Sequence, residues 1–233
     1  MAESFRNIDT KAEKCLAEFM DSNFYSKLHS KSGNPISFER KVDKDSQLNG
    51  VDVEIIVDEK RMYIDEKAAF YYSNAMIPTF AFEIDSIQKG HDNPVVGWFI
   101  NDKLQTDYYM LIWPNVKCDR IGKQWIMKDL KKLKKSDFTI IEAMLINKKR
   151  LLNAVYSQGL DSERLIEYAK RIRKLKRGAS ETYTEEFDNY IKIMYSGSIA
   201  EQPINAVIRK ELLKQVATGV YLISEDGYAV VKG

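Results

Sequence analysis

The stretch that decides the fold is residues 51–68, VDVEIIVDEKRMYIDEKA. Apolar and polar residues alternate on both sides of the polar segment 58–61, and this period of two is typical of β-strands. The pattern predicts a β-hairpin with strands over 51–57 and 62–68. One face of this hairpin is expected to be apolar and consists of Val51, Val53, Ile55, Val57, Met62 and Ile64.

The opposite face of the hairpin collects charged side chains. We expect a register that places Glu54 opposite Asp65 and, by the same pairing, Asp52 opposite Lys67. Carboxylates beside one lysine can hold a divalent cation through oxygen ligands, and such a cation neutralises a phosphate and lowers the pKa of a bound water. The alternative is a hairpin whose outward face is simply solvated.

The remaining sequence predicts an α+β or α/β fold around one mixed sheet. An amphipathic helix is expected over 9–28, strands over 79–85, 95–100 and 108–113, a short basic helix over 128–135, and a longer helix over 161–177. The 233 residues suit a single domain, in which 9–113 form the core and 114–233 form a basic, helical and mixed elaboration packed on it.

Composition narrows the chemistry. Two histidines supply a zinc site or a histidine-based triad poorly, so any metal should rest on carboxylates, which favour Mg²⁺ or Mn²⁺. Two distant cysteines predict reduced thiols. No apolar stretch approaches the roughly 20 residues that cross a bilayer, and the polar first residues lack a signal-peptide core. We therefore expect a cytoplasmic protein with no membrane partner.

Positive charge is concentrated in one part of the chain. Residues 117–177 contain 18 Lys and Arg but only 7 Asp and Glu. Such a segment suits a polyanion, although lysine-rich helices also have solvated faces for no other reason. The residues chosen for contacts with a nucleic-acid backbone are Lys148, Lys149, Arg150, Arg171 and Lys174.

The motif Gly50–Val53, followed by a hairpin and then Ile64–Ala68 (IDEKA), resembles the PD-(D/E)xK nuclease superfamily. That superfamily includes restriction endonucleases, Holliday-junction resolvases and phage-type exonucleases. The resemblance covers roughly residues 9–113 and implies a restriction-endonuclease-like αβββαβ core, a central mixed sheet flanked by helices. The proline of the motif is absent, since Val51 precedes Asp52.

The resemblance also implies roles for individual residues. Asp52 corresponds to the first metal-binding acid, Asp65 to the second, and Lys67 to the catalytic lysine. Glu66 holds the variable position, whose backbone carbonyl commonly ligates the metal. Many members add a glutamate from the first helix, which Glu18 or Glu13 would supply.

Two further candidates come from the residues themselves. Glu54 shares the charged face and is a candidate metal ligand. Gln47 lies in the polar loop before Asp52, where it could contact the phosphate or a metal-bound water, or simply belong to a polar loop.

The sequence therefore predicts a Mg²⁺-dependent nuclease (hydrolase) acting on DNA phosphodiester bonds, with a homodimer as a further arrangement to test. The rivals are a nucleic-acid-binding protein that keeps the fold without catalysis, and an interaction domain.

Overall fold

The structure is a computed structural model that describes residues 6–30, 32–88, 93–176 and 180–233, with side chains from Thr10 onward. Its contacts divide the chain into two compact units, each built from separate parts of the sequence. The larger unit contains the described residues up to Ile77, with 105–148 and 217–233. The smaller unit contains the described parts of 78–104 and 149–216. The units do not divide at residue 113, and the single domain expected for the whole chain stays a prediction.

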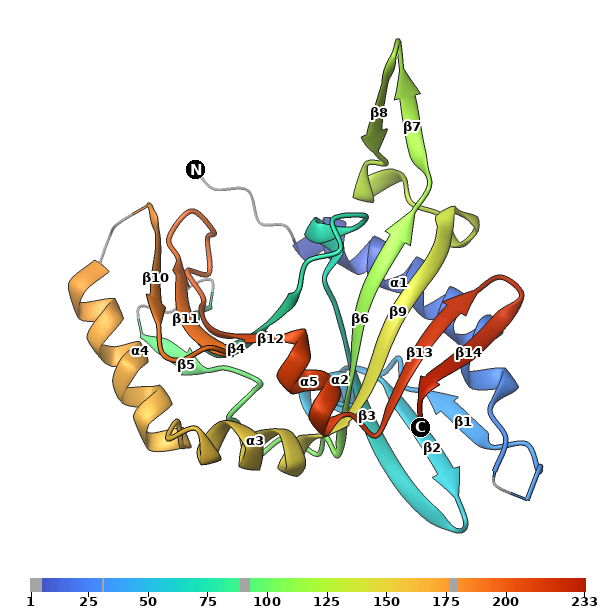
Figure 1. Ribbon diagram of the computed structural model, residues 1–233, viewed down its shortest axis with the longest axis horizontal. Helices are drawn as coiled ribbons and strands as arrows, with labels where there is room; N and C mark the ends of the chain where they lie inside the picture. Colours follow the sequence, from blue (N-terminus) through green and yellow to red (C-terminus); the bar gives the residue numbers. More distant parts are fainter. Residues whose placement is uncertain (1–5, 31, 89–92, 177–179) are drawn as a thin grey trace. The chain divides into compact units, whose positions relative to one another are not determined.

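A seven-stranded sheet forms the centre of the larger unit, in the order β1-β2-β3-β6-β9-β13-β14 (Figure 1). β3 and β6 run parallel, and the other neighbouring pairs are antiparallel. The expectation of a mixed α/β fold is confirmed at this level. The strands are β1 (Ser37–Arg40), β2 (Val53–Val57), β3 (Lys60–Ala68), β6 (Tyr108–Val116), β9 (Phe138–Asn147), β13 (Gly219–Ser224) and β14 (Gly227–Lys232).

Helices and a separate hairpin complete the larger unit. The β7–β8 hairpin forms a two-stranded sheet of its own. The elements are α1 (Arg6–Asn23), α2 (Lys44–Leu48), the one-turn 3-10 helices η1 (Tyr25–Lys27), η2 (Phe70–Tyr72), η3 (Leu130–Lys132) and η4 (Lys135–Asp137), and the strands β7 (Cys118–Ile121) and β8 (Gln124–Met127).

α1 packs its apolar stripe on one face of the seven-stranded sheet. Leu16, Phe19 and Met20 are almost fully buried, as the 3.6-residue period of the sequence predicts. They belong to one core cluster with Val53 of β2 and Ile64 of β3. Fully burying a side chain of this size contributes about 1.5–3 kcal/mol. The cluster therefore fixes which face of the β2–β3 hairpin is turned towards α1.

The β2–β3 hairpin forms in a register two residues away from the expected one. Glu54 lies opposite Tyr63, not Asp65, because the turn contains only Asp58 and Glu59. Both turn residues have positive φ, 49° and 64°, as in a type I′ turn, whose twist matches that of the flanking strands. A shift of two residues keeps every side chain on its face, so the expected charged face is still formed although the register differs.

The smaller unit is built on a five-stranded antiparallel sheet in the order β10-β11-β12-β4-β5. α4 contacts β4 and buries Leu165, Ala169 and Ile172, as expected for the helix over 161–177. The elements are β4 (Thr79–Ile87), β5 (Pro94–Val96), α3 (Lys148–Ser157), α4 (Ser162–Lys176), β10 (Thr182–Glu186), β11 (Ile191–Ser196), β12 (Ile204–Arg209) and α5 (Lys210–Val216).

The short basic helix expected over 128–135 is wrong, because the chain there forms η3 and η4. Leu130 and Leu133 are buried, and their spacing of three imitates a helical stripe. The Asp129 and Asp137 carboxylates accept backbone N–H groups locally and favour separate turns over one helix. The strand expected over 95–100 is correct only for its first part, since β5 ends at Val96.

In the part of the chain that the structure describes, no helix combines the length and the apolar character needed to span a membrane.

The observed turn generates a stability prediction. Glu59→Gly should raise the free energy of unfolding by ~0.5–1 kcal/mol, because glycine adopts positive φ without the steric cost that an L side chain pays. Urea denaturation measures this difference. Glu59→Ala is the matched control and should give no such gain. If the turn instead contained the four residues 58–61, as the sequence pattern predicts, Glu59→Gly would leave the free energy of unfolding unchanged or lower it.

Candidate active site

Asp52 is held at the point where β2 begins. Its backbone N–H donates to the Ile64 carbonyl at 2.9 Å, and its carboxylate Oδ2 accepts the Glu66 backbone N–H at 2.8 Å. The side chain thus replaces a backbone acceptor at the end of the β2–β3 ladder. Continuing the observed register by one pair places Asp52 opposite Asp65, on the same face of the hairpin.

Asp65 is a buried carboxylate with one oxygen unsatisfied. The Lys67 ammonium donates to Oδ1 at 2.5 Å, and the residue is 2% exposed. Among the described residues, Oδ2 has no hydrogen-bond partner. Burial raises the pKa of Asp65 to about 7; Lys67 opposes this, and the neighbouring Asp52 carboxyl adds to it. The two neighbouring carboxylates repel each other, and a cation bound between them would relieve this repulsion.

Lys67 is surrounded by negative charge. Burial by itself would lower the pKa of its ammonium, but Asp65, Asp52 and Glu13 outweigh burial and raise it. Lys67 therefore remains a cation at neutral pH. Its side chain as a whole is 29% exposed.

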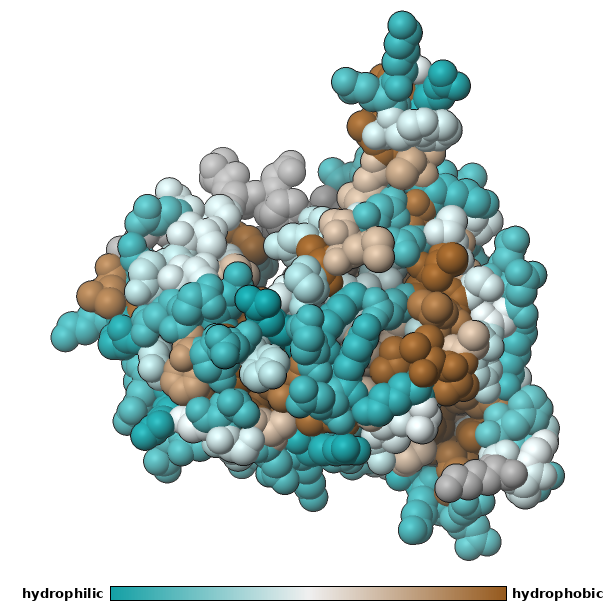
Figure 2. All heavy atoms as spheres, in the orientation of Figure 1, coloured by the Kyte–Doolittle hydropathy of each residue, from teal (hydrophilic) through white to brown (hydrophobic). Residues whose placement is uncertain are grey.

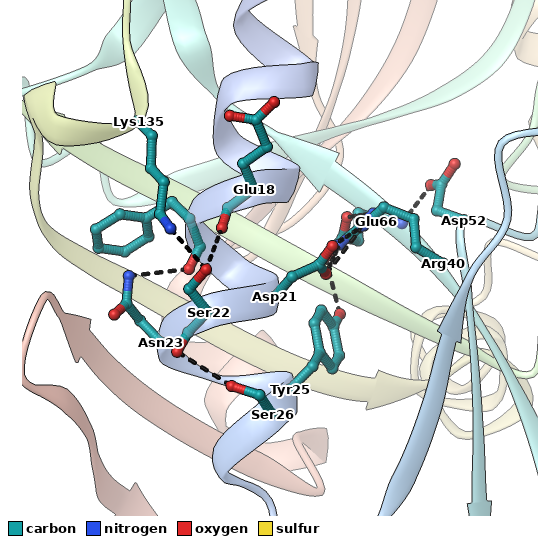
Figure 3. Close-up of polar contacts among 11 residues, drawn as sticks. Glu18, Asp21, Ser22, Asn23, Tyr25, Ser26, Arg40, Asp52, Glu66 and Lys135 are labelled. Atoms are coloured by element: carbon teal, nitrogen blue, oxygen red, sulfur yellow. Dashed lines mark hydrogen bonds and ion pairs between the residues drawn. The ribbon is translucent and has the colours of Figure 1, made fainter.

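Both acids of α1 considered from sequence are exposed. Glu13 raises the pKa of Lys67, but by less than Asp65 and Asp52 do. The Glu18 carboxylate points away from Asp52 and Glu66 (Figure 3).

Glu66 points to the other face of β3, where a polar cluster buries it. Tyr25 Oη donates to Glu66 Oε1 at 2.8 Å, and Arg40 Nη1 donates to Oε2 at 2.7 Å (Figure 3). Arg40 also holds Asp21, with Nε and Nη2 donating to Oδ1 at 2.9 and 2.8 Å. The Glu66 carboxylate is therefore committed to this cluster, and it is the Glu66 backbone N–H that donates to Asp52.

Sequence reasoning missed Arg40, Tyr25 and Asp21. They come from β1, η1 and α1, and no local spacing links them to Glu66. Only the tertiary fold brings them together.

Glu54 and Gln47 are not brought to the Asp52–Asp65 pair. Glu54 shares the face but is neutralised by Lys41 at 3.0 Å and Arg61 at 3.1 Å, so its carboxylate is already paired. Gln47 is exposed on α2, a helix that forms where a loop was expected because Asp43 caps it.

The predicted nucleic-acid contacts lie on α3 and α4. Lys149 and Arg150 are exposed, whereas Lys148 is 7% exposed and leaves little surface for a phosphate. Arg171 is paired with Glu185 at 2.6 Å. Lys174 is exposed and lines a cavity of about 490 Å³ in the smaller unit.

Within the described ranges, no three His, Cys, Asp or Glu side chains converge in a way that could hold a metal ion. The fit of a cation therefore rests on a smaller donor set. The unpaired Asp65 Oδ2 beside the Asp52 carboxylate supplies hard oxygen donors, which suit Mg²⁺ or Mn²⁺.

Comparison with models of protein families, with curated proteins and with solved structures finds no match to this chain.

The raised pKa of Asp65 predicts how stability depends on pH. Because the folded-state pKa lies above that of the unfolded chain, Asp65 costs stability as pH rises from about 4 to about 7. Asp65→Asn should therefore stabilise the metal-free protein at pH 8 by ~1–3 kcal/mol and by much less at pH 5. Urea denaturation in EDTA at both pH values measures the gap.

Asp58→Asn is the control for this experiment, since Asp58 is an exposed turn residue. It should show no comparable pH-dependent gain. An Asp65→Asn variant that is no more stable than the wild type at pH 8 contradicts the assigned electrostatics.

Proposed function

We propose that this chain is a metal-dependent nuclease that hydrolyses DNA phosphodiester bonds at Asp52, Asp65 and Lys67. One observation carries the proposal: the buried Asp65 carboxylate, one oxygen of which has no partner among the described residues, lies close enough to the Asp52 carboxylate to be affected by its charge, beside a partly exposed lysine. A structural ion pair would need only one carboxylate. The presence of a second carboxylate, that of Asp52, close to the buried Asp65 favours a site that receives a cation and a phosphate.

The donor set also includes a backbone group. The Glu66 N–H points towards Asp52, and the N–H and C=O of one strand residue point to the same side. The Glu66 carbonyl is therefore directed to the Asp52 side of β3, which agrees with the ligand that the family resemblance implies. When bound, Mg²⁺ or Mn²⁺ would neutralise the phosphate and lower the pKa of a water molecule.

Each residue has a role in this proposal. Asp52 and Asp65 hold the cation through their carboxylates. Lys67, fixed by Asp65 and kept protonated, attracts the scissile phosphate and orients the attacking water. Glu66 is a positioning residue: Arg40 anchors its side chain, and its backbone N–H donates to the Asp52 carboxylate.

The order of elements supports the proposed restriction-endonuclease-like core. α1 is followed by three antiparallel strands, β1, β2 and β3, and then by β6, which runs parallel to β3. The chain between β3 and β6 passes through η2, β4 and β5 in place of a single crossover helix. That connection is the main departure from an αβββαβ core.

A non-catalytic nucleic-acid-binding protein is the second candidate. The 2.5 Å contact between Lys67 and Asp65 favours it, because this ion pair can stabilise the hairpin without a metal. The two candidates differ in turnover.

Cleavage of supercoiled plasmid DNA with Mg²⁺ present decides between them. Lys67→Ala and Asp52→Asn should each lower the cleavage rate by at least ~100-fold, since they remove a charge that acts on the reacting phosphate. Lys60→Ala is the matched control: it removes an exposed lysine from the same strand and should cut like the wild type. Absence of cleavage in the wild type, or an equal rate in Lys67→Ala, moves the assignment to the binding protein.

Cation binding should depend on pH. Mn²⁺ should raise the thermal midpoint of the wild type at pH 8, and its affinity should fall up to ~10-fold per pH unit below about 7, as protons compete for Asp65. Thermal denaturation at several Mn²⁺ concentrations measures this.

Two variants sharpen the cation test. Asp65→Asn should lose the Mn²⁺ response. Glu54→Gln should keep it, because Glu54 is occupied by Lys41 and Arg61. A response lost in Glu54→Gln but kept in Asp65→Asn would place the cation elsewhere.

A further inference from the structure

The β7–β8 hairpin is the most exposed element of the larger unit. It projects from the ends of β6 and β9, beyond the seven-stranded sheet (Figure 1). Every residue of both strands is exposed. At the base of the hairpin, Lys117 Nζ donates to the Ser136 carbonyl at 2.7 Å and Lys128 pairs with Asp137 at 2.8 Å. These contacts tie the base of the hairpin to the body of the unit.

Large apolar side chains are exposed along this hairpin. Trp125 is 68% exposed and Ile121 64%, and Ile126 and Met127 are also exposed. In the space-filling view, apolar side chains appear among hydrophilic ones on the projection (Figure 2). An isolated two-stranded hairpin is marginally stable, and exposed apolar clusters usually mark an interaction site.

The charge of the hairpin indicates the kind of partner. Residues 117–128 carry four basic side chains and a single acidic one, Asp119; Lys128 is paired with Asp137, which leaves three basic side chains against one acid. Arg120 lies over the Trp125 ring, 5.9 Å from its centroid, on one face of the hairpin. The turn adds Lys123 beside Gly122. A basic ribbon with an exposed indole and guanidinium suits a phosphate backbone with bases or sugars beside it.

A second copy of the same hairpin is a poorer partner. Two basic ribbons placed side by side would repel each other, so charge complementarity favours a polyanion over self-pairing.

We infer that the β7–β8 hairpin is an arm that binds duplex DNA by entering its major groove. The major groove admits a two-stranded β-ribbon. Arg120 and Lys123 contact phosphates, and Trp125 packs against the groove wall. The choice of DNA rests on the proposed function.

The position of the arm suits a duplex that also reaches the candidate site. Leu111 pairs with Lys67, and β6 leads from there directly to β7. From Leu111 to Gly122 at the tip, the chain spans at most ~36 Å at ~3.3 Å per residue. That is about one turn of B-form DNA. The arm therefore binds within roughly one helical turn of the scissile phosphate.

Binding to a 20-base-pair duplex in EDTA tests the arm without requiring cleavage. Addition of duplex should quench the tryptophan fluorescence of the wild type, because Trp125 is 68% exposed, whereas Trp113 is buried and Trp98 is half-buried against Phe82 and Phe99. Trp125→Ala and Arg120→Ala should each weaken binding ~5–20-fold, and Trp125→Ala should lose most of the quenching. Val230→Ala, an exposed apolar residue on β14, is the matched control and should bind like the wild type.

Three outcomes would reject the assignment of the hairpin as a DNA-binding arm. The first is that both arm variants bind the duplex as tightly as the wild type. The second is that heparin competes equally well with no dependence on Trp125, and the third is that Trp125→Ala dissociates a dimer while DNA binding stays unchanged. The assay also includes a single strand of the same sequence, and tighter binding to the single strand than to the duplex would reject groove insertion.

The test separates this inference from the proposed function. Binding that depends on the arm, without plasmid cleavage in Mg²⁺, supports the arm and rejects the nuclease. Cleavage that depends on Lys67, with binding and cutting unaffected in the arm variants, supports the nuclease and rejects the arm.

Discussion

The buried ion pair between Glu66 and Arg40 is the interaction on which the candidate site depends. At 2.7 Å it joins β3 to β1, and through Asp21 and Tyr25 it joins both strands to α1 and η1. Side chains alternate along a strand, so anchoring Glu66 on one face directs Asp65 and Lys67 to the other. A buried ion pair is weak evidence for stability, since desolvation offsets its attraction. Its contribution here is to fix geometry.

The same anchor determines the backbone at Asp52. The Glu66 N–H donates to the Asp52 carboxylate, so one residue is held by its side chain on one side of the sheet and holds a site carboxylate with its backbone. This arrangement is unfavourable for Asp65, because burial beside a second carboxylate disfavours its charged form. Perturbed carboxyl groups of this kind are common at functional sites, which agrees with the proposed cation site.

Much of the site followed from sequence because strand periodicity is robust. The expected register of the hairpin was wrong, yet Asp52, Asp65 and Lys67 still share a face, since the error was an even number of residues. The I′ turn was missed because neither Asp58 nor Glu59 is the glycine that usually signals positive φ. The roles of Glu54 and Glu66 could not be predicted from the hairpin pattern alone. Glu54 is paired with Lys41, which follows β1, and with Arg61 of β3, whereas Glu66 is held by Arg40 of β1 and Tyr25 of η1.

The division into two units was hidden for a related reason. β3 and β6 are adjacent parallel strands, and a parallel pair requires a long connection. Here that connection carries β4 and β5, which pair with each other, and β4 also pairs with β12 from the second half of the chain. Local patterns identify these strands but do not assign them to a sheet. β6 pairs with the strand of Lys67 and leads into β7, so one strand connects the candidate site to the β7–β8 hairpin. The proposed site and the proposed DNA-binding arm therefore both lie in the larger unit.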